Sequence, residues 1–205
     1  DVFVSDIKEP DAAAVKGFEE KGIKWEGCGN TERVLEADEI VVSSGISPKA
    51  PIIEAARAKG ITVTGELDFV SPYLSGIVIG VTGSNGKTTT TSMIGYFLEQ
   101  MGYSVMTGGN IGNAVAHAAG KDYDFIVLEL SSFQLATTRL LHPRVATLLN
   151  VTPDHVEWHG SLEAYAAAND LFTLTDPAAL EAAAREALEN NPDMVKTYRS
   201  GKTSV

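Results

Sequence analysis

Short apolar runs alternate with amphipathic stretches along the first part of the chain. The runs are rich in valine and isoleucine, as buried parallel strands are, and the stretches between them have the spacing of helices. The predicted strands lie at 1–6, 39–45 and 61–66, and the predicted helices at 12–22 and 51–60. Because strand and helix alternate, this part of the chain predicts an α/β fold with helices on both faces of a parallel sheet.

A second unit with the same alternation begins near Ser75. Its predicted strands are IVIGVTG, YSVMTGG, DFIVLEL and VATLLN, which start at residues 77, 103, 124 and 145. Its predicted helices are 88–101, 114–120 and 161–170, the last of them capped by Ser161. Polar residues end all four strands, at the edge where parallel sheets collect ligands.

The pattern changes near Asp176, where an alanine-rich segment has the spacing of helices throughout. Asp176 with Pro177, and Asn191 with Pro192, are favourable helix starts. We therefore expect three parts: a Rossmann-like domain at 1–73, a second parallel-sheet domain at 74–170 and a helical tail at 171–205.

The composition is that of a soluble globular protein, with 44% hydrophobic and 21% charged residues. Sixteen basic and 27 acidic residues give a net charge of −11, which argues against a protein that binds duplex nucleic acid by general electrostatic attraction. The single cysteine, Cys28, has no partner for a disulfide or a CxxC motif. No apolar run approaches the ~20 residues that span a bilayer, and no signal peptide opens the chain, so we expect a cytoplasmic location.

The segment GVTGSNGKTTT at 80–90 joins a predicted strand directly to a predicted helix through a tight glycine turn. The two glycines allow backbone angles and a close approach that a Cβ would forbid, and we expect successive N–H groups to point into the loop at the positive end of the helix. A lysine and a threonine follow, which suit outer phosphates and Mg²⁺. The segment predicts a nucleoside triphosphate site formed by Gly83, Ser84, Asn85, Gly86, Lys87, Thr88 and Thr89.

The glycine spacing departs from the common pattern G-x-x-x-x-G-K-[ST], because residue 81 is valine and the nearer glycine stands only three residues before Gly86. With this spacing, TGSNGKTTT resembles the ATP loop of the Mur ligase family and of its folylpolyglutamate synthase relatives. GGNIG at 108–112, LELSSFQL at 128–135 and NVTPDH at 150–155 agree with the family in order and character. LELSSFQL together with GGNIG most resembles the branch of the family that adds D-glutamate. VFVSD and VVSSGISP resemble the UDP-binding domain of that branch.

The resemblance implies an ATP-dependent ligase of peptidoglycan synthesis, with ATP and Mg²⁺ as cofactors. It would join D-glutamate to UDP-N-acetylmuramoyl-L-alanine (UDP-muramoyl-alanine) through an acyl phosphate. The first domain would bind UDP and the second would be the P-loop-type ATPase domain. Lys87 and His155 would serve catalysis, and the metal ligands would be Thr88, Glu129 and His155. The substrate contacts would be Asn110, Ser131 and Gln134 on the muramoyl side, and Asp6, Ser43, Ser44 and Gly45 on the UDP side.

Three features depart from the family pattern. The strand, glycine-rich turn and helix that the family has before VFVSD are absent, and so is the C-terminal domain that brings the incoming amino acid. A family lysine that becomes carbamylated and supports a second metal is replaced by Asn169, whose amide cannot carry a carbamate. We therefore expect a truncated or chimeric chain, or one that lacks residues in the sequence given, with inefficient turnover.

The last residues, ALENNPDMVKTYRSGKTSV at 187–205, resemble the tail domain of the B subunit of the tRNA-dependent Asp/Glu amidotransferase. One alternative is thus a non-catalytic nucleotide-binding fragment or chimeric scaffold, whose tail packs elsewhere or engages RNA weakly. A P-loop kinase or nucleotidase is a third candidate, disfavoured by the loop spacing and by LELSSFQL. For the remaining histidines, His117, His142 and His159, and for Trp158 we expect structural roles.

Overall fold

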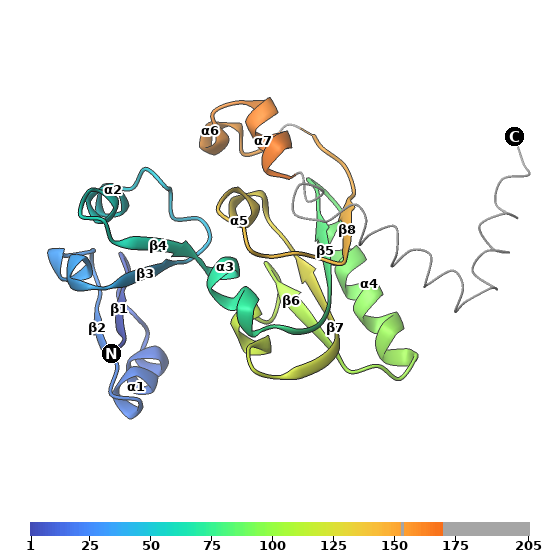
Figure 1. Ribbon diagram of the computed structural model, residues 1–205, viewed down its shortest axis with the longest axis horizontal. Coiled ribbons are helices and arrows are strands. Elements are labelled where there is room, and N and C mark those ends of the chain that lie inside the picture. The colour runs from blue at the N-terminus through green and yellow to red at the C-terminus, as the bar shows by residue number, and fades with distance from the viewer. Residues whose placement is uncertain (153, 170–205) are drawn as a thin grey trace, which may run out of the picture. The chain divides into compact units, whose positions relative to one another are not determined.

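The computed structural model describes residues 1–152 and 154–169. The chain forms two compact units, Asp1–Gly65 and a second that begins at Glu66 (Figure 1). Every strand pairing in the described residues is parallel, which confirms the predicted α/β class. The predicted tail at 171–205 lies outside the described residues.

The first unit consists of two separate pairs of parallel strands, each pair joined by a helix. In the first pair, α1 connects β1 to β2, and in the second pair α2 connects β3 to β4. The bounds are β1 Phe3–Ser5, α1 Ala12–Glu20, β2 Lys24–Glu26, η1 Glu32–Glu36, β3 Glu39–Val42, α2 Pro51–Ala58 and β4 Thr62–Gly65. The strands of this unit thus pair in parallel, as predicted, but no strand pairing joins one pair to the other, so they form two two-stranded sheets.

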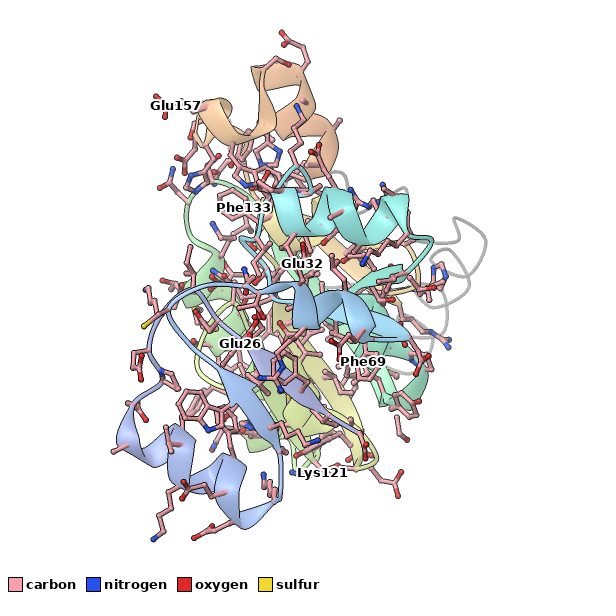
Figure 2. The ribbon with its side chains drawn as sticks, turned by 90° about the vertical axis from the view of Figure 1, so that its left-hand side faces the viewer. Glu26, Glu32, Phe69, Lys121, Phe133 and Glu157 are labelled. Atoms are coloured by element: carbon pink, nitrogen blue, oxygen red, sulfur yellow. The ribbon has the colours of Figure 1, made fainter. Side chains whose placement is uncertain are left out.

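Local contacts explain why these short elements form. The Asp11 carboxylate accepts a hydrogen bond from Ala14 N at 2.8 Å and caps α1, while Pro51 stands in the first turn of α2. Glu26, at the end of β2, accepts hydrogen bonds from the hydroxyls of Thr31 (2.6 Å) and Ser5 (2.8 Å). The Thr31 hydroxyl is the largest cause of the lowered pKa of Glu26, whose position Figure 2 shows.

The second unit is built on a four-stranded parallel sheet in the order β6-β7-β5-β8. Helix α4 packs on one face, and α3 with the 3₁₀ turn η3 lies on the other. The bounds are α3 Glu66–Val70, η2 Ser71–Tyr73, β5 Ser75–Thr82, α4 Lys87–Gln100, β6 Val105–Gly109, η3 Val115–Ala118, β7 Asp122–Glu129, α5 Ser132–Ala136, β8 Val145–Leu148, α6 Val156–His159 and α7 Leu162–Ala168. Strand β5 lies between β7 and β8, so the loop that follows it has a neighbouring strand end on each side.

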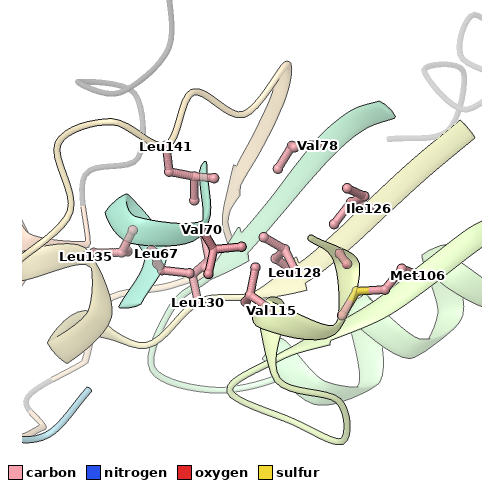
Figure 3. Close-up of a cluster of buried hydrophobic side chains, with 11 residues drawn as sticks. Leu67, Val70, Val78, Met106, Val115, Ile126, Leu128, Leu130, Leu135 and Leu141 are labelled. Carbon is pink, nitrogen blue, oxygen red and sulfur yellow. The ribbon is translucent and has the colours of Figure 1, made fainter. Parts of the chain in front are cut away.

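Alternate residues of β7 face opposite sides of the sheet. Ile126 and Leu128 enter the core shared with α3 and η3, whereas the neighbouring Glu129 hydrogen-bonds to Thr88 of α4. Figure 3 shows this core, whose residues are Leu67, Val70, Val78, Met106, Val115, Ala118, Ile126, Leu128, Leu130, Leu135 and Leu141. One face of the sheet is thus covered by this core and the other by α4, over the buried side chains of Val81 and Val127. Glu129 lies on the α4 side, at the carboxyl end of β7.

The structure refines the sequence-based expectations for several elements. Leu67 and Val70 pack in the core of the second unit, and the first compact unit ends at Gly65, whereas the domain boundary that we expect from the sequence lies at residue 73. The segment predicted as a helix at 114–120 forms only the 3₁₀ turn η3, and the residues after β7 form the short helix α5, which the sequence analysis did not predict. No helix in the described part of the chain combines the length and the hydropathy that crossing a bilayer requires.

Candidate nucleotide-binding site

The loop between β5 and α4 needs both of its glycines. Gly83 has φ +133°, and a Cβ on it would lie 3.0 Å from the carbonyl oxygen of Asn150. Gly86 has φ +87° at the N-terminus of α4, a left-handed conformation that glycine adopts without strain. The loop is therefore shaped by backbone geometry and by a neighbouring segment that approaches closely.

Lys87 lies across this loop from the first turn of α4. Its ammonium donates hydrogen bonds to the carbonyl oxygens of Gly83 (2.7 Å) and Ser84 (3.1 Å). No side chain caps the N-terminus of α4, and the first N–H groups of a helix have no acceptor within it. Free donors, the positive end of the helix and a lysine ammonium thus meet at one place, which favours an anion.

Glu129 ends β7 beside the loop and is only 2% exposed. Its Oε2 accepts a hydrogen bond from the Thr88 hydroxyl at 2.7 Å, and its Oε1 accepts one from Asn110 Nδ2 at 3.0 Å. Asn110 N also donates to the Glu129 carbonyl oxygen at 2.9 Å. The structure therefore brings Thr88 and Glu129 together, as the sequence predicted, and uses Asn110 to orient the carboxylate.

The oxygen donors of Thr88 and Glu129 suit Mg²⁺, which prefers hard ligands. In proteins this ion commonly binds one or two carboxylates together with substrate phosphates. Within residues 1–152 and 154–169 no group of three or more His, Cys, Asp or Glu side chains could hold a metal. The pair fits a cation that arrives with a phosphate, and it does not form a complete metal site by itself.

His155 lies in the segment after β8, with φ +49°. Its ring packs against Phe133 with 4.7 Å between centroids, and its Nε2 lies 3.6 Å from the Asp154 carboxylate. The contacts described for its side chain include neither Thr88 nor Glu129. The metal-binding and catalytic roles of His155 remain predictions.

Phe133 is the centre of an aromatic cluster that joins α5, α6 and α7 (Figure 2). The rings of Trp158 and His159 pack against it, and the Tyr165 ring packs against His159. His159 Nε2 lies 3.0 Å from the Ser132 hydroxyl. Burial lowers the pKa of His159, and the charge of His155 lowers it further. Trp158 and His159 thus have the packing roles that we expected.

The outer side of the phosphate loop is held by residues that the sequence analysis did not select. Ser84 N donates to Asn150 O at 3.0 Å, and Asn85 N donates to Asn150 Oδ1 at 2.9 Å. The expectation that successive loop N–H groups point inward is wrong for these two residues, because Asn150 competes for them from outside. The motif NVTPDH contained the signal, since it places Asn150 just beyond β8.

The predicted muramoyl-side residues are engaged within their own helix. Ser131 and Gln134 form a capping box at the start of α5, with Ser131 Oγ 3.1 Å from Gln134 Oε1. Both are buried, at 9% and 3% exposure. This arrangement satisfies their polar groups locally, so their contact with a substrate remains a prediction.

The predicted UDP-side residues follow two strands of the first unit. Asp6 follows β1, and its carboxylate accepts a hydrogen bond from Lys8 N at 2.8 Å. Ser43, Ser44 and Gly45 form an exposed turn after β3. Because β1 and β3 belong to separate strand pairs, no pairing holds these residues together, and their roles stay predictions.

Asn169 ends α7 and is 1% exposed. Its Oδ1 lies 2.8 Å from the Thr82 hydroxyl, and its Nδ2 donates to the Tyr165 carbonyl oxygen at 2.9 Å. Both ends of the amide are therefore engaged inside the protein, beside the strand that carries the phosphate loop.

Two family models match the chain. The model of the MurD N-terminal domain matches residues 1–52, and that of the Mur ligase middle domain matches residues 81–181, which extends beyond residue 170 into the predicted tail. Three curated relatives are named UDP-N-acetylmuramoylalanine–D-glutamate ligase. The chain is 44% identical to the one from Desulfatibacillum aliphaticivorans, 45% to that from Koribacter versatilis and 39% to that from Acidobacterium capsulatum. The alignments cover 81%, 74% and 90% of this chain but only 38%, 34% and 44% of those relatives, so the chain spans less than half of their length.

Two solved structures have a fold similar to that of this chain. The UDP-N-acetylmuramate:L-alanyl-gamma-D-glutamyl-meso-diaminopimelate ligase from Neisseria meningitides has a TM-score of 0.56 at 22% identity, covering 84% of this chain and 60% of that one. The UDP-N-acetylmuramate–alanine ligase from Thermotoga maritima has a TM-score of 0.53 at 24% identity, covering 86% and 42%. Both similarities concern the fold, and the sequence matches carry the relationship. The chain belongs to the Mur ligase family.

Proposed function

We propose that this chain is the nucleotide-binding part of an ATP-dependent ligase that joins D-glutamate to UDP-muramoyl-alanine in peptidoglycan synthesis. The observation that carries the proposal is the meeting of Lys87, Thr88 and Glu129 at one end of the sheet. The names of the curated relatives supply the substrates.

In the proposed reaction a carboxylate oxygen of the muramoyl-alanine attacks the γ-phosphorus of ATP, and ADP leaves. The amine of D-glutamate then attacks the acyl carbon, phosphate leaves and the nitrogen loses a proton. Phosphoryl transfer depends mainly on positioning and on neutralising charge. Lys87 would exchange its loop carbonyls for phosphate oxygens, and Thr88 with Glu129 would hold Mg²⁺, which neutralises charge on the phosphates.

Asn169 favours a second candidate, a nucleotide-binding chain with little or no ligase turnover. The resemblance gives this position to a carbamylated lysine that supports a second metal. Here a neutral amide fills the position, and its two polar atoms bond to Thr82 and Tyr165. Asn169 therefore cannot carry a carbamate, and its amide is held inside the protein, so it would not support a second metal as that lysine would.

Calorimetric titration of the full chain with Mg·ATP tests the nucleotide site. Lys87→Ala should lose measurable binding and keep the fold, because a charge-assisted contact with the phosphates is removed. Lys16→Ala is the matched control, since Lys16 is an exposed lysine of α1 whose side chain is 75% accessible. If Lys87→Ala bound ATP as well as the parent, our placement of the phosphates would be wrong.

Phosphate release distinguishes the two candidate functions. Release that requires both UDP-muramoyl-alanine and D-glutamate supports the ligase. ATP binding without such release supports the non-catalytic nucleotide-binding chain, and absence of ATP binding overturns both.

A further inference from the structure

The segment after β8 continues along the phosphate loop. Strand β8 pairs with β5, and Leu149 N donates to Thr82 O at 3.0 Å just beyond the last paired residues. The pairing then extends into the loop, where Ser84 N donates to Asn150 O at 3.0 Å. Gly83 lies between these two bonds, and a Cβ there would lie 3.1 Å from Asn150 N. The backbone of 149–150 therefore lies directly against the loop.

The side chain of Asn150 binds both backbone groups of Asn85. Its Oδ1 accepts from Asn85 N at 2.9 Å, and its Nδ2 donates to Asn85 O at 2.9 Å. This paired arrangement needs a donor and an acceptor on one planar group, which a side-chain amide provides and a carboxylate does not. The peptide group on each side of Asn85 is thereby held in a fixed orientation.

The Ser84 side chain is held by the backbone of Thr152 and by Tyr165 of α7. Ser84 Oγ donates to Thr152 O (3.0 Å) and accepts from Thr152 N (2.8 Å). Because a serine hydroxyl has one proton, the Tyr165 hydroxyl, 2.8 Å away, must donate to it. Tyr165 is 2% exposed, so its ring position is set by packing. Ser84 and Asn85 are thus held from outside through side chain and backbone.

The hydrogen bonds from the loop to Asn150 determine which donors the loop has left for a ligand. With Ser84 N and Asn85 N turned outward, the carbonyl oxygens of Gly83 and Ser84 accept from the Lys87 ammonium. The donors left for an anion are the ammonium and the first N–H groups of α4. We propose that Asn150 is a positioning residue that holds the phosphate loop in the shape that receives a polyphosphate. This inference rests on the proposed ATP binding.

Two substitutions at Asn150 test the proposal in the full chain. Asn150→Ala removes both hydrogen bonds to Asn85 and should weaken the binding of Mg·ATP about tenfold, since two modest hydrogen bonds no longer organise the loop. Asn150→Asp should weaken it further, because the carboxylate opposes Asn85 O and adds negative charge beside the phosphates. Asn30→Asp, an exposed position in the first unit, is the control for the same chemical change.

The readouts are dissociation constants for Mg·ATP and for inorganic tripolyphosphate, measured by displacement of a fluorescent ATP analogue well below each variant's melting temperature. The dissociation constants of both ligands should rise by the same factor, because the phosphates are the only part that the two ligands share. A general loss of stability would lower the melting temperature without changing these constants, and that result would overturn a positioning role. Weaker binding of ATP with unchanged binding of tripolyphosphate would also overturn the positioning role of Asn150.

Tyr165→Phe provides a second test if the Asn150 variants fail to fold. It removes only the hydroxyl that donates to Ser84 and leaves the ring in place. The binding of both ligands should therefore weaken, but by less than in the Asn150 variants. A parent chain that binds no ATP refutes the proposed function. A parent that binds ATP alongside folded variants that bind equally well refutes only this inference.

Discussion

At the scale of single residues, the site depends on a buried carboxylate that two neighbours hold in place. Thr88 and Asn110 each donate to one oxygen of Glu129. The residues after the glycine turn suggested Thr88, and the resemblance to the Mur ligase family added Glu129 as its partner. The motif NVTPDH placed Asn150 just beyond β8 but did not show what its side chain contacts, and Tyr165 was not selected at all. Both contact the loop across 65 and 81 residues of sequence, and local patterns do not show which side chains meet over such separations.

Glu129→Gln should remove most of the Mg²⁺ dependence of ATP binding while leaving some binding. The amide keeps the size of the side chain but loses the charge that attracts the cation. Its oxygen can still accept from Asn110 Nδ2, and its NH₂ group can donate to the Thr88 hydroxyl, so the local packing should be kept. ATP titrations with and without Mg²⁺ measure the difference. An unchanged ratio of the two affinities would exclude Glu129 as a ligand.

At the scale of elements, most strands could be predicted from their apolar runs, whereas several short segments could not. β2 has only three residues, Lys24–Glu26, which is too short for a clear period. Residues 114–120 are rich in alanine and so predict a helix, yet only Val115–Ala118 forms a turn. Val115 and Ala118 are fully buried against the sheet. Packing thus overrides propensity there.

Helix α4 and strand β6 approach so closely that only glycine fits at residue 95. A Cβ on Gly95 would overlap the Thr107 hydroxyl. Gly95→Ala should therefore destabilise the second unit by about 1–3 kcal/mol, as overpacking does. Gly17→Ala is the control inside α1, where a Cβ meets nothing within 4 Å and should stabilise by about 0.5–1 kcal/mol. Urea unfolding of both variants checks the opposite signs.

The contact between α5 and α6 should weaken in acid through His159. Because the folded pKa of His159 is lowered, the unfolded chain binds the proton more readily. Stability from this group is therefore complete above about pH 6.5, the ordinary value, and falls as the pH drops from there toward the folded pKa. His159→Gln should reduce the pH dependence of the melting temperature between about pH 5 and 7. An equal slope in parent and variant would contradict this.

At the scale of the whole molecule, the chain divides into two units at Gly65. All residues of the loop, the Thr88–Glu129 pair and Asn150 belong to the second unit, and the predicted UDP contacts belong to the first. Each unit has its own strand pairings. Ligands specific to one unit should therefore stabilise that unit alone.

Calorimetry with separate ligands tests this division. Mg·ATP should raise only the melting temperature of the second unit, by an amount that corresponds to about 2.7 kcal/mol at 100 times its dissociation constant. UDP should act only on the first unit, if the Asp6 and Ser43–Gly45 positions bind it. A shift of both transitions by ATP would show that the units unfold together.

The sequence by itself determined the parallel α/β class, the phosphate loop and the family, because apolar periodicity, glycine positions and short motifs are local properties. Only the tertiary structure decided that the first sheet is two pairs, that residues 66–73 belong to the second unit and that Asn150 turns two loop amides outward. Those outcomes depend on which segments, distant in sequence, compete for the same hydrogen bonds and buried space. Local patterns do not encode that competition.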